Sequence, residues 1–271
     1  MYTTKVYDLP EWVAHIPFLF LRFCMKLENF FKNNPKAAIA FSGGVDSAYL
    51  LYAAMTFGAE VKAYYVASEF QPEFEKRDAL RLAEELGTDI QILPLQVLCD
   101  QNIRANPSDR CYYCKKQIFS AIVKAAAEDG FSLILDGSNA SDNAGDRPGM
   151  RVLQEMSVRS PLRECGLTKA QIRELSKEAG LFTWDKPAYA CLATRIPTGE
   201  EITIEKMQTT ELAEDYLFSL GLTDFRVRSQ NGHARLQVPE KQIQTVLSHR
   251  TDILDKLKPY YKSISLDLEV R

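Results

Sequence analysis

The sequence contains no long hydrophobic run. Its most apolar stretch, residues 16–21, is followed at once by Arg22 and is much shorter than the ~20 residues of a membrane-spanning helix. Asp8 and Glu11 precede this stretch, which is the wrong order of charges for a signal peptide. We therefore interpret it as part of an amphipathic helix that packs on the body of a cytoplasmic protein, and we expect no membrane partner.

Cysteine, histidine and net charge are also scarce. The 271 residues include six cysteines and three histidines, and 33 Lys and Arg stand against 36 Asp and Glu, for a net charge of −3. Six cysteines are too few for a disulfide framework in a chain of this length, which favours thiol or metal chemistry. The small negative charge disfavours nucleic acid as a partner.

The predicted elements alternate between strands and helices. Short apolar runs predict strands at 37–41, 60–66, 89–95 and 131–136. Helices are predicted between them, including Pro72 to Gly87, 114–128 and, from the capping box Thr168 with Gln171, 168–180. This order predicts an α/β fold with a parallel sheet that is covered on both faces and binds ligands beyond the carboxyl ends of its strands.

The pattern changes near residue 197, which predicts two domains, 1–197 and 198–271. The second domain is predicted to be a small α+β unit. Its elements are a helix over 204–220, strands at 224–229 and 233–238 on either side of Asn231-Gly232, a helix after Pro239, and a strand at 263–270. Asn-Gly between two alternating runs is a strong β-hairpin signal.

A glycine-containing loop follows the first predicted strand and precedes the first helix. It comprises Ser42, Gly43, Gly44, Val45, Asp46 and Ser47. Two glycines let the backbone approach a phosphate, and the helix N-terminus presents free N–H groups to it. Asp46 fits a role as a Mg²⁺ ligand or as a helix cap. The loop lacks the Gly-Lys-Ser/Thr ending of a Walker motif, and instead matches the ATP loop of the PP-loop, or adenine nucleotide α-hydrolase, superfamily.

Three cysteines form a candidate site. Cys111 and Cys114 make a Cys-x-x-Cys pair at the start of a predicted helix, and Cys191 lies 77 residues after Cys114. A zinc site usually requires a fourth ligand, which the scattered histidines do not offer. A redox dithiol, an iron–sulfur cluster on three cysteines and unligated thiols remain open from the residues alone. The other three cysteines, Cys24, Cys99 and Cys165, are interpreted as packing or surface thiols.

With these motifs in place, the chain resembles the LarE family of ATP-dependent sulfur transferases. The matching stretches are residues 41–47, 110–115, 136–140, 146–149, 158–162, 186–197, 225–228 and 266–269. They cover nearly the whole chain in family order. The fold that this resemblance implies is a Rossmann-like PP-loop domain followed by a smaller α+β domain.

The resemblance also implies an activity in the biosynthesis of the nickel-pincer nucleotide cofactor of lactate racemase. ATP and Mg²⁺ would activate a carboxylate of a pyridinium-3,5-dicarboxylate mononucleotide as an acyl-adenylate, and sulfur would then displace AMP to leave a thiocarboxylate. Family members with three cysteines are thought to carry a [4Fe-4S] cluster, and others sacrifice the sulfur of one cysteine. The resemblance therefore implies a cluster on Cys111, Cys114 and Cys191, with sacrifice of Cys191 as the alternative.

Several charged residues are candidates for the same site. Arg195 and Lys186 flank Cys191 and could stabilise negative charge on phosphate or on a developing oxyanion, or form structural ion pairs. Asp136 and Asn139 follow the fourth predicted strand, where they could position metal or substrate, or cap a turn. We predict catalytic roles for Cys191, Asp46 and Arg195.

The predicted hairpin places arginines opposite one another. A two-residue turn pairs Arg228 with Arg235 and Arg226 with Gln237, on the face opposite the apolar one. Like charges in opposed positions are destabilising, and a bound anion would relieve the repulsion. We predict that Arg226, Arg228 and Arg235 bind the phosphate of the substrate or of a nucleotide effector.

Other functions remain alternatives at this stage. A tRNA-thiolating enzyme would use the same loop, but it requires a larger basic surface than the net charge favours. A non-enzymatic nucleotide-binding module would need none of the three cysteines, and a glutamine-dependent synthetase would need a further domain. We expect a small-molecule nucleotide substrate and a homo-oligomer; the sequence does not identify the sulfur donor.

Overall fold

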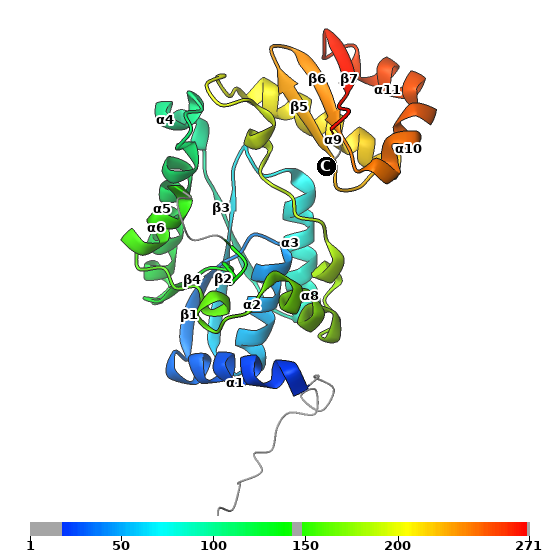
Figure 1. Ribbon diagram of the computed structural model, residues 1–271. Coiled ribbons are helices and arrows are strands. Elements are labelled where there is room, and N and C mark those ends of the chain that lie inside the picture. The colour runs from blue at the N-terminus through cyan, green and yellow to red at the C-terminus, as the bar shows by residue number, and fades with distance from the viewer. Residues whose placement is uncertain (1–17, 143–147, 270–271) are drawn as a thin grey trace, which may run out of the picture.

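The computed structural model describes residues 18–142 and 148–269. Two sheets of different size organise this part of the chain, and Figure 1 shows the larger one flanked by helices below the smaller one. The predicted N-terminal helix is present as α1 (Phe18–Asn33). None of the helices within the described ranges has the length and hydrophobicity needed to cross a bilayer.

The larger sheet is parallel, as predicted. Its strands are β1 (Lys36–Ala40), β2 (Glu60–Ala67), β3 (Ile90–Pro94) and β4 (Ile134–Leu135), in the order β3-β2-β1-β4. The prediction of a strand over 131–136 is wrong in length, because only two residues of this segment pair with β1. Phe131 instead anchors the segment by burying its ring in the core.

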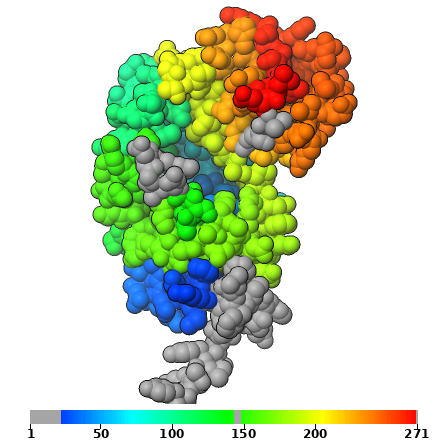
Figure 2. Space-filling view, viewed as in Figure 1, coloured from blue at the N-terminus to red at the C-terminus, as the bar shows by residue number. Residues whose placement is uncertain are grey.

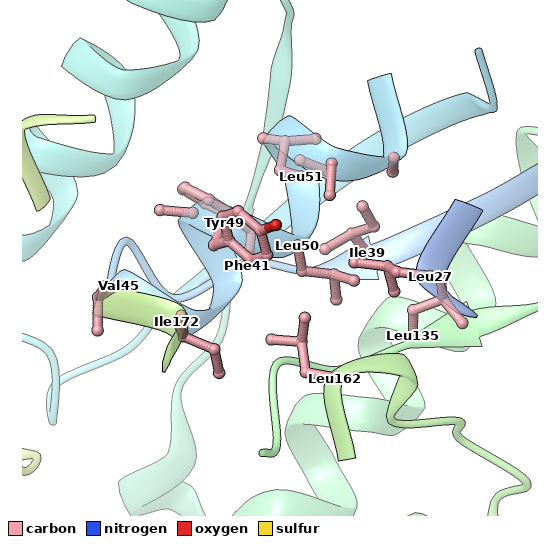
Figure 3. Packing of buried hydrophobic residues seen from close by; sticks show 14 of the residues in the cluster. Leu27, Ile39, Phe41, Val45, Tyr49, Leu50, Leu51, Leu135, Leu162 and Ile172 are labelled. Atoms are coloured by element: carbon pink, nitrogen blue, oxygen red, sulfur yellow. The ribbon is translucent and has the colours of Figure 1, made fainter. Parts of the chain in front are cut away.

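Helices cover both faces of this sheet, which is the α/β arrangement that the alternation predicts. On one face, α2 (Val45–Thr56) and α8 (Lys169–Glu178) pack with α1 in one hydrophobic cluster, of which Figure 3 shows ten labelled residues. On the other face, α5 (Arg110–Glu128) and α6 (Pro148–Glu155) form a second cluster. The helix that connects β2 to β3 is α3 (Glu73–Leu86).

Shorter elements connect these layers. They are α4 (Gln101–Arg104), α7 (Pro161–Glu164) and the 3₁₀ turns η2 (Val97–Cys99), η3 (Phe182–Asp185) and η4 (Leu192–Arg195). The prediction that a helix begins at residue 114 is wrong: α5 begins at Arg110. Pro107 and Asp109 precede this start, so both cysteines of the Cys-x-x-Cys pair lie within the first two turns.

The smaller sheet contains the predicted hairpin. Its strands are β5 (Arg226–Gln230), β6 (His233–Gln237) and β7 (Ser263–Leu266), and they pack on α9 (Ile204–Ser219), α10 (Ile243–Ser248) and α11 (Arg250–Leu257); η5 (Glu240–Gln242) precedes α10. The register pairs Arg228 with Arg235 and Arg226 with Gln237, as predicted. The last strand ends earlier than predicted, and Leu268 is 91% exposed. The division at residues 197 and 198 stays a prediction.

Candidate active site

The phosphate loop lies where β1 ends and α2 begins. Its two serines hold it closed: the hydroxyls of Ser42 and Ser47 are 3.1 Å apart, and the Ser42 amide donates to the Ser47 hydroxyl at 3.2 Å. Gly44 is the N-cap of α2 and provides no side-chain acceptor, so the first turn keeps amides for an anion. Gly43 has a φ of +72°, which favours glycine at this position.

A glycine outside the loop, Gly137, packs directly on it. A Cβ atom on Gly137 would lie 2.9 Å from the backbone nitrogen of Ser47 and 3.2 Å from the carbonyl carbon of Asp46. Both neighbours are backbone atoms and cannot swing aside. The segment after β4 therefore fixes the position of the phosphate loop through close backbone contact.

Asp46 has one paired and one unpaired carboxylate oxygen. Lys169 donates to Oδ2 at 2.6 Å, whereas Oδ1 is buried and has no hydrogen-bond partner among the described residues. Burial raises the pKa of Asp46, and Lys169 acts in the opposite direction. An unpaired carboxylate oxygen beside a phosphate loop fits a hard cation such as Mg²⁺. Sequence reasoning missed Lys169, although the capping box had placed it at the start of a helix.

Lys186 also reaches the phosphate loop. Its ammonium group pairs with Asp78 at 2.7 Å and donates to the carbonyl of Gly43 at 3.4 Å. The prediction that Lys186 stabilises phosphate charge stays a prediction. The contact with Gly43 nevertheless places a cation at the edge of the loop.

One cavity of about 560 Å³ joins the phosphate loop to the Cys-x-x-Cys helix. Its wall includes Ser42, Asp46 and Ser47 from the loop and Cys111 and Lys115 from α5. Figure 2 shows this face of the molecule hollowed between the green and the yellow-green segments. The arrangement places a sulfur-bearing side chain in the space that a nucleotide on the loop would enter.

The three candidate cysteines influence one another electrostatically. The pKa of Cys114 is raised to about 12, mainly by burial and then by the neighbouring Cys191 and Cys111, in that order. Burial also raises the pKa of Cys191, while Arg110 lowers it. The structure therefore brings together thiols that are far apart in sequence. Within the described ranges, no group of three His, Cys, Asp or Glu side chains has the arrangement of a site for a single metal ion.

The remaining cysteines lie apart from this group. Cys24 and Cys165 are buried and Cys99 is exposed, and all six cysteines are free thiols. Burial raises the pKa of Cys165 to about 11, which keeps its thiol protonated at neutral pH.

Two buried arginines hold the segment around Cys191. Arg110 donates to the carbonyl of Ala193 at 3.0 Å and to the Asn106 side chain at 2.7 Å. Arg195 is fully buried and donates to the carbonyl of Ala190 at 2.7 Å. Sequence reasoning gave Arg110 no role, because nothing local shows that its side chain reaches Ala193, which lies 83 residues later in the chain.

Arg195 forms a two-point ion pair with Glu214. The Nε and Nη2 atoms donate to the two carboxylate oxygens of Glu214 at 2.8 and 2.9 Å. Tyr189 donates to the same carboxylate, and its ring lies 4.4 Å from the Arg195 guanidinium carbon. These contacts favour a positioning role, and the predicted catalytic role of Arg195 stays a prediction. Sequence reasoning missed Glu214.

Asp136 and Asn139 differ in their surroundings. Asp136 lines the cavity and accepts hydrogen bonds from the hydroxyls of Ser138 and Ser160. Asn139 is buried and accepts from the backbone of Ser141 at 2.8 Å, which is a turn-closing contact. Positioning of substrate or metal by these residues stays a prediction.

Two of the three hairpin arginines line a second hollow of about 630 Å³. Arg228 and Arg235 line it, together with Thr194 and His233, whereas Arg226 is not among its lining residues. Arg228 donates to the Gln237 side chain at 2.7 Å and to the Thr194 carbonyl at 2.5 Å. Arg235 lies 3.4 Å from Asp267. The repulsion expected from the register is therefore partly relieved by protein acceptors.

The fold and the loop define the chain as an α/β enzyme of the PP-loop class, which acts on ATP. No family model matches the sequence. The chain is 35% identical over 240 residues to pyridinium-3,5-bisthiocarboxylic acid mononucleotide synthase of Lactiplantibacillus plantarum, covering 88% of this chain and 87% of that protein. It belongs to the LarE family of ATP-dependent sulfur transferases.

Other relatives agree with this assignment. An uncharacterized protein of Synechocystis is 39% identical over 223 residues, which is 81% of this chain and 83% of that protein. A more distant relative, the tRNA-specific 2-thiouridylase MnmA of Thermotoga maritima, is 24% identical over 193 residues, 56% of this chain and 54% of that protein. The match to MnmA agrees with the PP-loop fold.

Proposed function

We propose that the protein adenylylates a carboxylate of a pyridinium-3,5-dicarboxylate mononucleotide and converts it to a thiocarboxylate. The product of this reaction belongs to nickel-pincer nucleotide biosynthesis. The observation that carries the proposal is the cavity shared by the phosphate loop and Cys111. The substrate is chosen from the activity named for the Lactiplantibacillus relative, a pyridinium-3,5-bisthiocarboxylic acid mononucleotide synthase.

The first step requires orientation more than proton transfer. A substrate carboxylate is already ionised and can attack the α-phosphorus of ATP, with pyrophosphate as the leaving group. The α2 amides and Lys186 would hold the phosphates, and Asp46 would hold Mg²⁺ through its unpaired oxygen. A sulfur nucleophile then attacks the acyl-adenylate carbon, and AMP leaves with the electrons of the broken C–O bond.

Cys111, Cys114 and Cys191 would hold a [4Fe-4S] cluster. Their mutual electrostatic influence and the three-thiol donor set support this part of the proposal. Such a cluster, when bound by three cysteines, leaves one iron without a protein ligand and supplies a place for exogenous sulfide. Arg110 and Arg195 would position the Cys191 segment through its backbone carbonyls.

The hairpin would bind the substrate phosphate. Arg228 contacts the carbonyl of Thr194, and the Thr194 hydroxyl donates to the carbonyl of Cys191 at 2.9 Å. A phosphate on Arg228 would therefore lie one short segment away from the sulfur site. Arg226 and Arg235 complete the proposed basic face.

The activity is tested by incubating the protein with the dicarboxylate mononucleotide, ATP and Mg²⁺ under anaerobic conditions. We expect AMP and pyrophosphate in equal amounts, and a product heavier than the substrate by the difference between sulfur and oxygen. Pyrophosphate release that does not depend on the mononucleotide would contradict the proposed substrate.

The sulfur source is tested with Cys191→Ala and, as a matched control at an exposed thiol, Cys99→Ala. The cluster predicts iron, sulfide and a visible absorption band in the anaerobic wild-type and Cys99→Ala proteins, and their loss in Cys191→Ala. A colourless wild-type protein that loses the mass of H₂S during turnover would support sacrifice of Cys191 instead.

The phosphate site is tested with Arg228→Ala against Arg235→Ala. Arg228 is oriented by two acceptors, whereas the Arg235 side chain is 57% exposed. We expect the KM for the mononucleotide to rise at least about tenfold in Arg228→Ala, and less in Arg235→Ala. An unchanged KM in both variants would remove the hairpin from the proposal.

A further inference from the structure

Glu75 is a carboxyl group in the nucleotide cavity to which the proposed reaction gives no task. It lies in the first turn of α3 and lines the same cavity as Ser42, Asp46 and Ser47. The backbone of Glu75 also supports the phosphate loop, because a Cβ atom on Gly43 would lie 3.1 Å from its carbonyl oxygen. Within the described residues, no side chain donates a hydrogen bond to the Glu75 carboxyl group, and none forms an ion pair with it.

The charges around Glu75 do not offset the free-energy cost of burying its ionised carboxylate. Lys186 and Arg195 favour the ionised form, but Lys186 is already paired with Asp78 and Arg195 with Glu214. Asp78 opposes ionisation from the next turn of α3. Burial is the largest influence and raises the pKa of Glu75 to about 7.

The other titratable groups that face Glu75 are phenols. Tyr65 of β2 and Tyr189 of the segment before Cys191 both have a pKa that Glu75 helps to raise, after larger contributions from burial. Both phenols therefore remain neutral at physiological pH and place no positive charge beside the carboxyl group. The Tyr65 hydroxyl is itself buried without a hydrogen-bond partner among the described residues.

An ATP molecule on the loop would bring several negative charges toward this carboxyl group. Phosphate oxygens accept hydrogen bonds and donate none, so an ionised glutamate can only repel them. A neutral carboxylic acid, in contrast, offers one O–H donor.

We propose that Glu75 binds ATP as a neutral carboxylic acid, taking up a proton from solvent as the nucleotide enters and donating it in a hydrogen bond to a phosphate oxygen. This inference rests on the proposed use of ATP at the phosphate loop. It predicts that the affinity for the nucleotide falls as the pH rises above neutrality. The reason is that Glu75 is then increasingly ionised in the free protein and must take up a proton before the nucleotide binds. No covalent bond is formed or broken in this step.

The test is calorimetric binding of α,β-methylene-ATP with excess Mg²⁺, in buffers of different ionisation enthalpy, at about pH 6.5, 7.5 and 8.5. We expect the wild-type protein to take up between about half a proton and one proton per nucleotide at the middle pH. Its affinity should fall by up to about tenfold per pH unit above neutrality. Glu75→Gln keeps a donor for phosphate but cannot titrate, so it should lose both the proton uptake and the pH dependence.

Glu73→Gln is the matched control, because Glu73 lies on the same helix but is exposed and pairs with Lys76. It should behave as the wild type. Equal proton uptake in Glu75→Gln and wild type would overturn the inference, as would loss of binding by a folded Glu75→Gln protein. A wild type that binds nucleotide with the expected uptake but makes no thiocarboxylate would overturn the proposed substrate alone.

Discussion

At the scale of the residue, the buried pair of Arg195 and Glu214 fixes the segment that carries Cys191. Neither side chain is more than 1% exposed, and the pair shares its hydrogen bonds with Tyr189 and the amide of Val227. Buried ion pairs add little net stability compared with apolar substitutes, but breaking one partner leaves an uncompensated charge. We therefore interpret the ion pair as a positioning interaction: it orients Arg195, which donates to the Ala190 carbonyl next to Cys191.

We expect Arg195→Met to lower the free energy of unfolding by ~3–5 kcal/mol, because Glu214 would stay buried without its cation. The double variant Arg195→Met, Glu214→Leu should recover part of this loss. Urea denaturation of Arg195→Met, of Glu214→Leu and of the double variant measures the coupling between the two side chains. A single variant as stable as the wild type would show that the pair is not needed to hold this region.

We expect Gly137→Ala to impair ATP use without unfolding the protein. The new methyl group would meet the Ser47 and Asp46 backbone, so the phosphate loop must shift. Steady-state kinetics should show a KM for ATP raised by about tenfold or more. Gly130→Ala is the control: its Cβ meets nothing within 4 Å, although its φ of +78° should cost about 1 kcal/mol of stability. An unchanged KM in Gly137→Ala would mean that the loop tolerates the displacement.

At the scale of the element, α8 connects a local cap to the phosphate site. Thr168 and Gln171 form the capping box that the sequence predicts, and Lys169 in the first turn reaches Asp46 of α2. The cap is local and can be read from four residues. The ion pair requires α2 and α8 to lie side by side, which no local pattern specifies.

We expect Thr168→Ala to lower the free energy of unfolding by ~1 kcal/mol, because the N3 amide loses its acceptor. Thr168→Ser keeps the hydroxyl and should stay within a few tenths of a kcal/mol of the wild type. Chemical denaturation of both variants provides the measurement. Equal losses in the two variants would point to the lost methyl group rather than to the cap.

Element boundaries differ from prediction where tertiary contacts decide them. β4 contains only two residues that pair with β1. Earlier in the predicted strand, Phe131 packs its side chain into the second hydrophobic cluster. The strand predicted over 263–270 ends at Leu266, which pairs with Leu236 of β6. Alternation reports which residues could share a face and not how far a neighbouring strand extends.

At the scale of the whole molecule, the loop, the Cys-x-x-Cys pair and the hairpin register could be predicted because each has a short sequence signature, whereas Cys191 was added to the pair only by the family resemblance. Glu75, Lys169, Arg110 and Glu214 could not, since their roles depend on contacts between segments that are distant in the chain. The parallel order β3-β2-β1-β4 makes β1 and β4 neighbours, so the phosphate loop after β1 lies against Gly137 after β4. The predicted homo-oligomer stays a prediction.

The folded state as a whole should respond to pH through Glu75. Burial raises the pKa of Glu75 to about 7, above its ordinary value of 4.5, so the folded protein holds this proton more tightly than the unfolded chain. Stability should therefore fall as pH rises between these two values and stay lower above them. Relative to Glu75→Gln, we expect the wild type to lose at most ~3 kcal/mol between about pH 4.5 and 7.5. Unfolding curves of the two proteins that stay parallel across this range would contradict the expected burial of the charge.

The close contact between Gly137 and the phosphate loop has a consequence for biogenesis. The loop sequence is complete once Ser47 has been synthesised. The residues that contact the loop and support it, Gly137, Lys169 and Lys186, are synthesised up to about 140 residues later. A nascent chain would therefore contain the loop sequence long before the loop could bind a nucleotide. Parallel sheets with such long-range pairing fold slowly, so the capacity to bind ATP should appear late and all at once.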